Sequence, residues 1–270
     1  MKTRVASTLA MTILLSVTSA TATVIQTLGG APQVLIPAAG STAGANGTFF
    51  HSDIYVSNRT SRTQTVRFDW LPQAGNGGTT MQVEMAAGSV IRSTDFVRDV
   101  LNVSGLGAIL VTGITSTGAV DRTAWLRVSS RIWTTQPGST GTTSQSFPAI
   151  DTDTISTHLR ACVSGAGGSE NGANYRVNVG VVNLDPKKPQ TFFAYIDTGS
   201  GTPTGQTFIV PPLSMQQISM GNGLAPTTDI VIENITGQQS DAWIAYGSTV
   251  DNVTGDAWSE MAVPGPPWDY

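Results

Sequence analysis

Apolar and polar residues alternate along much of this chain, in short segments that turn-forming residues separate. In residues 46–58 the alternating apolar positions are Phe50, Ile54 and Val56, and in residues 64–70 they are Val66, Phe68 and Trp70. A period of two indicates a strand with one buried face. Clusters of Gly, Pro, Asn and Ser recur about every 8 to 15 residues, as expected of turns between strands. Sustained helical periodicity is absent from the sequence, so we predict an all-β protein.

The same pattern occurs twice along the chain. NGTFFHSDIYVSN at residues 46–58 returns 125 positions later as NGANYRVNVGVVN at 171–183, and VEMAAGS at 83–89 returns as FIVPPLS at 208–214. AWLRVSS at 124–130 is answered by AWIAYGS at 242–248. Six such segments keep their order, which indicates an internal duplication. The predicted equivalences include Phe50 with Tyr175, Val56 with Val181, Val111 with Ile232, and Trp125 with Trp243.

Short antiparallel strands between frequent turns, in copies of this length, are typical of the immunoglobulin-like sandwich. We therefore predict two tandem immunoglobulin-like β-sandwich units, the first over residues 23–147 and the second over residues 148–270. A closed barrel of the same strands is the structural alternative. In the first unit, TDFVRDVLNVSG at 94–105 predicts one short helical turn. TTQPGSTGTTSQS at 134–146 has the composition of a linker, but its short counterpart in the second copy favours a hairpin loop.

The first 22 residues have the features of a cleaved secretory signal peptide. Lys2 and Arg4 are followed by an apolar stretch over residues 5–17 and by small residues at 20–22. The stretch is shorter than the roughly 20 apolar residues that span a bilayer, and no later segment is long and apolar enough to do so. We expect a secreted or cell-surface protein, extracellular or periplasmic, with no transmembrane segment in the mature chain.

Charge and cysteine content narrow the range of partners. Charged residues make up only 12% of the chain, and its formal net charge is -4. Nucleic-acid binding needs clustered Lys and Arg, and the sequence has no such cluster. Cys162 is the single cysteine, so no intrachain disulfide can form, and we expect it to behave as a small apolar side chain.

Several phrases together carry a resemblance to a known group of proteins. These are IPAAGSTAGANGTFFHSDIYVSN, VEMAAGS, YRVNVGVVNLDPKKPQT and AYGSTVDNVTGDAW. The chain resembles bacterial, acidobacterial-type secreted proteins that carry tandem immunoglobulin-like β-sandwich repeats. The resemblance covers most of the chain beyond the leader. It implies the fold and an exported location, and it brings no catalytic residues.

The sequence offers little for catalysis or metal binding. His51 lies on the predicted outward face of a strand, where a solvated surface role is favoured over that of a base or ligand. His158 lies near Asp151, Asp153 and Cys162, but no pair among them has the spacing of a structural zinc site, and one more strand is the simpler interpretation. No G-x-S-x-G motif occurs. We predict no catalytic, cofactor-binding or metal-binding residues, and therefore no enzyme.

Aromatic residues near loops are the remaining candidates for ligand contact. Trp133, Trp258 and Trp268 could stack on sugar rings, although packing at the rim of the sheets is the alternative. DNVTGD at 251–256 is predicted to be a hairpin turn rather than a calcium loop. The predicted function is that of an exported, non-enzymatic surface, matrix or adhesion-type protein, and the alternative is a carbohydrate-binding module. An extracellular polymer, a glycan or a surface protein would be the partner.

Overall fold

Strands make up nearly all of the regular structure. The computed structural model describes residues 30–44, 47–75, 78–136, 138, 140–155, 158–168, 175–197, 203–236 and 242–265. The first unit contains β1 (Gln33–Ala43), β2 (Phe49–Asn58), β3 (Gln64–Pro72), β4 (Thr80–Met85), β5 (Val90–Ser93), α1 (Phe96–Asp99), β6 (Gly105–Ile114), β7 (Leu126–Thr135), β8 (Thr142–Phe147) and β9 (Ile150–Asp151). The all-β prediction is confirmed, and α1 lies where one short helical turn was expected. The predicted signal peptide lies outside the described residues.

The second unit begins after a 3-10 helix, η2 (Thr152–Thr154). It contains β10 (Arg160–Val163), β11 (Tyr175–Asn183), β12 (Gln190–Asp197), β13 (Gly205–Val210), β14 (Ser214–Asn222), β15 (Asp229–Asn234), β16 (Trp243–Asp251), β17 (Ala257–Met261) and β18 (Val263–Pro264). Its strands form two sheets in the orders β13-β12-β15-β10-β18 and β14-β11-β16-β17.

In the first unit the strand β1 joins two layers. Residues Gln33–Ser41 of β1 pair with β6, and Thr42 and Ala43 then pair with β2. The path through the unit is β4-β3-β6-β1-β2-β7-β8, with β5 beside β2 and β9 beside β1. Because β9 pairs with β1, strand pairing in the first unit continues past residue 147. Strands β7 and β8 pair as the expected hairpin requires, with Thr135 opposite Thr142.

Strand pairing in the two units follows the same plan. In β2 and β5, Val56 pairs with Ile91, and in β11 and β14 the residues 125 positions later, Val181 and Gln216, form the same pair. Other matching pairs are Phe68 with Val111 in the first unit and Ala194 with Ile232 in the second. This agreement of registers supports the inferred duplication.

One predicted equivalence is wrong by a single residue. Asn58 at the end of β2 pairs with Leu126, and Asn183 at the end of β11 pairs with Trp243. The counterpart of Trp243 is therefore Leu126 rather than Trp125. Trp125 is 50% exposed, whereas Trp243 is fully buried. The shared Ala-Trp letters suggested the wrong alignment, and a shift of one residue in a strand moves a side chain to the opposite face.

Asn58 and Asn183 hold equivalent turns in the two units, and they are the final Asn of the repeated phrase. Both side chains are fully buried. Each Nδ2 atom donates to three backbone carbonyls, those of Arg62, Met85 and Ala86 for Asn58 and those of Lys188, Val210 and Pro211 for Asn183. Each amide thus fixes two turns to the end of a central strand. This requirement explains why the phrase ends in Asn both times.

Each unit has a buried apolar core of its own. Ile54, Val56 and Phe68 belong to the first core, and Val179 and Val181 belong to the second. All five side chains are completely buried, which confirms the inward positions predicted from the period-two pattern.

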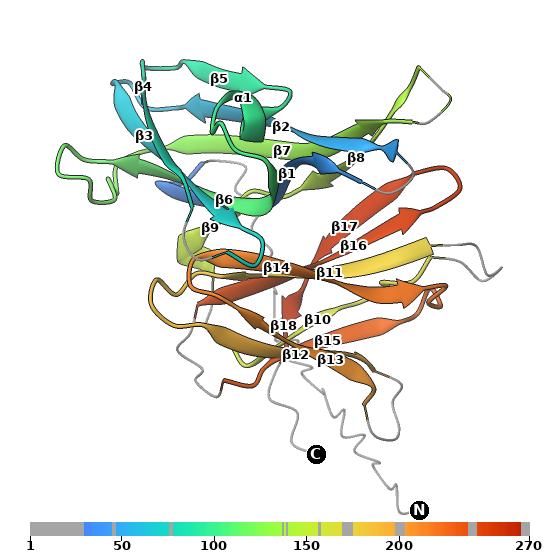
Figure 1. The fold of residues 1–270 in the computed structure, drawn as a ribbon. Coiled ribbons are helices and arrows are strands. Elements are labelled where there is room, and N and C mark those ends of the chain that lie inside the picture. The colour runs from blue at the N-terminus through green and yellow to red at the C-terminus, as the bar shows by residue number, and fades with distance from the viewer. Residues whose placement is uncertain are drawn as a thin grey trace, which may run out of the picture.

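A third apolar cluster lies between the units. Its buried members are Leu35, Ala38, Leu71, Ala108 and Phe147 from the first unit and Val182, Met215, Ile244 and Tyr246 from the second. The sheet with β3, β6 and β1 packs through it on the sheet with β14, β11 and β16, and Figure 1 shows the resulting stack of four layers. Strands β1 and β16 are consequently buried on both faces over most of their length. We refer to this cluster as the interface core.

Candidate functional site: a cleft between the two units

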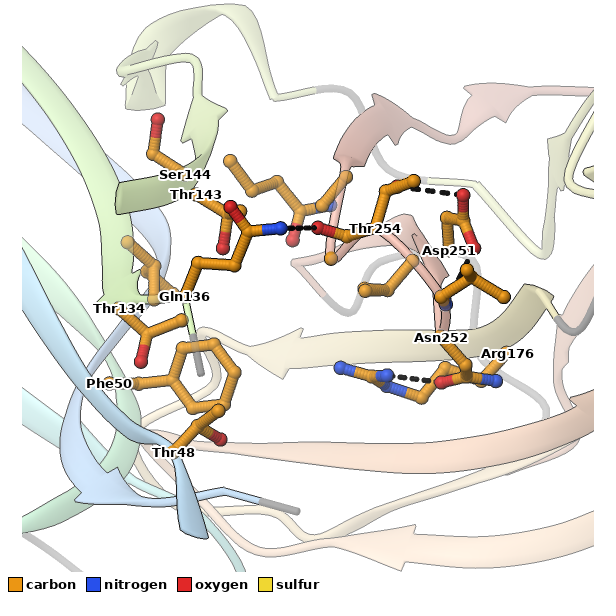
Figure 2. A pocket seen from close by; sticks show the side chains of 16 residues that line it. Thr48, Phe50, Thr134, Gln136, Thr143, Ser144, Arg176, Asp251, Asn252 and Thr254 are labelled. Carbon is orange, nitrogen blue, oxygen red and sulfur yellow. Dashed lines mark hydrogen bonds between the residues drawn. The ribbon is translucent and has the colours of Figure 1, made fainter. Parts of the chain in front are cut away.

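A cleft of about 280 Å³ opens where the two units meet. One wall comes from β2, β7 and β8 of the first unit, and the other comes from β11, β16 and the hairpin that joins β16 to β17 (Figure 2). The first wall is rich in neutral polar side chains: Thr48, Thr134, Gln136, Thr143, Ser144 and Gln145. Phe50 and Ile132 add apolar surface. The lining is therefore mixed, with hydroxyl and amide groups beside apolar side chains.

The cleft continues the edge of the interface core. Ile132 of β7 packs against that core and also lines the cleft. Thr134, two positions further along the strand, lines the cleft as well. On the other wall, Val177 of β11 points into the second unit's own core, so its neighbour Arg176 points toward the first unit. The alternation of β-strand side chains thus brings Arg176 and Thr134 to the same space.

Hydrogen bonds across the units hold the two walls together. Gln136 donates from Nε2 to the carbonyl of Thr254 at 2.9 Å, and Ser248 donates to Oε1 of Gln145 at 3.0 Å. The Nε2 atom of Gln145 also donates to the carbonyl of Trp258. At another part of the boundary, the amide of Ala74 donates to the carbonyl of Met215 at 3.0 Å. These bonds and the interface core fix the width of the cleft, so the site is preformed.

The hairpin at residues 251–256 forms one rim of the cleft. Its backbone closes through the amide of Asp251, which donates to the carbonyl of Asp256, and the amide of Gly255, which donates to the carbonyl of Asp251, both at 2.8 Å. The Asp251 carboxylate accepts from the Thr254 hydroxyl at 2.7 Å and the Val253 amide at 2.8 Å, and these bonds lower its pKa. The predicted hairpin turn is confirmed, and the Asp251 carboxylate is committed to that turn.

Arg176 is the one cationic side chain among the described residues that line the cleft. Its side chain is half-buried, and burial lowers the pKa of its guanidinium from the usual range, although arginine stays protonated at neutral pH. The guanidinium donates from one Nη atom to Oδ1 of Asn252. Figure 2 shows it pointing across the cleft toward Phe50. Among the described residues, no carboxylate forms an ion pair with Arg176, in contrast to arginines such as Arg92 and Arg122. Arg176 lies 125 positions after His51 and is its counterpart in the repeat.

Two of the tryptophans predicted to contact a ligand, Trp133 and Trp258, do not line this cleft. The ring of Trp133 stacks on His51 with centroids 4.7 Å apart, and its Nε1 donates to the carbonyl of Thr94 at 2.9 Å. Trp258 meets the ring of Tyr175 edge-on at 5.6 Å. Each ring is partly buried against an aromatic residue of its own unit. Trp268 falls outside the described residues, and a stacking role for the three residues stays a prediction.

His51 has a different environment from the one predicted. Its Nδ1 atom lies 2.7 Å from Oδ2 of Asp95, whose side chain is only 3% exposed. Ser41 and Arg98 contact the same carboxylate oxygen, at 3.2 and 3.1 Å. The expectation of a solvated surface histidine is wrong, because the segment that contains α1 folds over this end of β2. The hydroxyl of Ser41 bonds to the carboxylate rather than to the imidazole, so this grouping lacks the serine-to-histidine bond that activates a nucleophile.

The four residues considered for a metal site have other partners. Asp153 pairs with Arg122 at 2.6 Å, and the carboxylate of Asp151 accepts from the Asp153 amide at 3.0 Å. The ring of His158 packs on Trp243 with centroids 4.2 Å apart. Cys162 is half-buried, and burial is the main cause that raises its pKa. Within the described part of the chain, no group of three or more His, Cys, Asp or Glu residues could hold a metal ion.

Comparison with known proteins assigns no family. No protein-family model matches the chain, and no curated protein matches it either. In the part of the chain that the structure describes, no helix reaches the length and apolarity that crossing a membrane requires.

Proposed function

We propose that this chain is an exported, non-enzymatic binding protein of the surface, matrix or adhesion type, whose ligand occupies the cleft between the two units. The observation that carries the proposal is the construction of the cleft. Both units contribute walls, and the interface core and the hydrogen bonds of Gln136 and Gln145 hold those walls in place. A preformed site loses little conformational entropy when it binds a ligand. The secreted location is part of this proposal and is supported by the leader-like residues 1–22.

The lining favours a carbohydrate as the ligand. Hydroxyl and amide side chains can donate to and accept from sugar hydroxyls, and Phe50 offers a ring against which the apolar face of a sugar can pack. The volume of about 280 Å³ lies just below the ~300–1,000 Å³ typical of small-molecule sites, which suits one residue of a polymer. Carbohydrate binding would in this case use the cleft rather than a row of exposed aromatic rings.

A binding screen with a cleft-filling variant tests this proposal. The full chain would be screened against a panel of glycans and extracellular polymers, together with Thr143→Trp, which places an indole in the cleft. Thr142→Trp is the control, because Thr142 is the exposed neighbour of Thr143 on β8 and does not line the cleft. We expect saturable binding by the parent and by the control. Thr143→Trp should bind with an affinity that is lower by about tenfold or more.

Two results would contradict the proposal. If the Thr143→Trp variant binds as tightly as its parent, the ligand lies elsewhere, and Trp133 and Trp258 become the candidates. If the chain cleaves a glycan of the panel, the non-enzymatic assignment is wrong. Thermal unfolding of both variants would establish that each is folded.

A further inference from the structure

Arg176 carries a positive charge, and no carboxylate in the described part of the chain forms an ion pair with it. Asp251 is the one carboxylate among the described residues that line the cleft, and its two oxygens accept hydrogen bonds from Thr254 and Val253. Asn252 accepts one hydrogen bond from Arg176 and is neutral. Across the cleft, Thr48, Thr134 and Phe50 present hydroxyls and a ring, with no charge.

This arrangement is costly unless a ligand completes it. A guanidinium has five N–H donors, and within the described residues the amide oxygen of Asn252 is the one acceptor for those of Arg176. A partly desolvated cation without an anion is destabilising, and an arginine fork that faces open space is suited to a planar carboxylate. The second unit could have placed a neutral residue here without loss of packing in its core, because Arg176 points away from that core.

We infer that the cleft binds an acidic saccharide, with Arg176 pairing with the carboxylate of a uronic-acid residue. The carboxylate accepts from the free N–H groups of the guanidinium in a two-pronged contact. The ring of the sugar then lies between the arginine and Phe50, within reach of the hydroxyls of Thr48 and Thr134. This inference rests on the proposed function and adds the chemical class of the ligand.

The charge of the whole chain sets a further expectation. Its formal net charge is -4, so long-range attraction does not draw polyanions to it. Recognition through a single arginine releases few counter-ions, and the affinity should therefore depend only weakly on salt concentration. A protein that bound acidic polymers through a basic patch would lose affinity steeply over the same range.

Calorimetric titration of the full chain with matched sugars tests the inference. The probes are glucuronate and galacturonate, their neutral counterparts glucose and galactose, and galactose 6-sulfate. The variants are Arg176→Gln, which removes the charge, and Arg176→Lys, which keeps the charge but removes the fork. Arg122→Gln is the control, because it removes an exposed arginine at a distance from the cleft lining.

For the parent and for Arg122→Gln, we expect an affinity for the uronates at least about tenfold higher than the affinity for the neutral sugars. Arg176→Gln should bind both kinds of sugar equally weakly, and Arg176→Lys should fall between. Thermal unfolding without ligand separates a binding role from a structural one. Arg176→Gln should unfold at the same temperature as the parent or higher, because it removes a desolvated charge; a structural arginine would give a lower temperature.

Each other outcome would overturn the inference in a distinct way. If neutral sugars bind as well as uronates and Thr143→Trp abolishes both, the proposed function stands and the acidic ligand is wrong. A preference for galactose 6-sulfate over the uronates would assign the site to sulfated sugars. Retention of the uronate preference by Arg176→Gln would remove Arg176 from recognition. If no saccharide of any kind binds, both the inference and the carbohydrate assignment fail.

Discussion

Position 180 requires a glycine because the ring of Tyr246 lies too close for a Cβ atom. Replacement of Gly180 therefore tests the packing of the interface core. The two residues are paired across β11 and β16. A Cβ atom at position 180 would lie 2.1 Å from Cζ and 2.4 Å from Oη of the Tyr246 ring. Tyr246 is fully buried in the interface core, and its hydroxyl donates to Oε1 of Gln217 at 3.0 Å. The ring therefore cannot move aside without breaking other contacts.

The magnitude follows from these contacts. Overpacking of a filled core costs about 1–3 kcal/mol, and displacement of the ring also weakens the Gln217 bond by about 1 kcal/mol. Alanine restricts the unfolded chain more than glycine does, which returns roughly 0.4–1 kcal/mol. We expect Gly180→Ala to lower the free energy of unfolding by about 1–3 kcal/mol.

A double-mutant cycle with Tyr246→Ala isolates the clash. Tyr246→Ala alone should cost about 3–5 kcal/mol, because it leaves a cavity in the interface core. In that background the methyl group that Gly180→Ala adds has room, so the second substitution should cost nothing further. Equilibrium unfolding in urea, followed by tryptophan fluorescence, measures the four proteins. If the two effects add within about 0.5 kcal/mol, Gly180 and Tyr246 are not in the contact described, and the packing argument is refuted.

Two further predictions concern the scaffold. Asn58→Ala and Asn183→Ala each remove a buried donor that holds three backbone carbonyls, so each should lower the free energy of unfolding by about 2–4 kcal/mol. Urea midpoints check this, and a neutral result at either position would contradict the equivalence of the two turns. The pKa of Asp53 is lowered chiefly by the hydrogen bond from Arg92. The stability that Asp53 contributes is therefore fully present above its unfolded-state pKa of about 3.9, and it is lost as the pH falls through the lower folded-state pKa. Asp53→Asn should therefore lower the melting temperature at pH 6 and lower it by less at pH 2. An equal decrease at both pH values would argue against the ion pair.

Much of the scaffold could be predicted from local patterns. The inward positions of Ile54, Val56 and Val181 follow from a period of two, because successive strand residues point to opposite faces. The repeat strengthened the prediction, since one set of strands had to satisfy both copies. The hairpin at 251–256 was predicted because its short polar sequence separates two strand patterns.

Two predictions, the equivalence of Trp125 with Trp243 and the environment of His51, are wrong because sequence similarity does not give the pairing of strands or what covers them. Trp125 and Trp243 share the dipeptide Ala-Trp, yet the pairing of Asn58 with Leu126 shifts the correct alignment by one residue. His51 occupies an outward position on β2, as the pattern indicates, but the segment before α1 covers it and supplies Asp95. A strand pattern says which side a residue faces and not what lies over that side.

Strand order in sequence was therefore enough to indicate the elements, the two cores and the turns, because these depend on residues near one another in the chain or repeated within it. The contact between the units could not be predicted in this way. Tyr55 pairs with Ser129 in the first unit, and the equivalent pair in the second unit is Gly180 with Tyr246. Tyr246 is buried because the first unit packs against its sheet. The cleft has the same origin, because Arg176 and Thr134 line one space only where the two units pack together. Hydrophobic periodicity indicates that a face is buried but does not indicate which surface buries it.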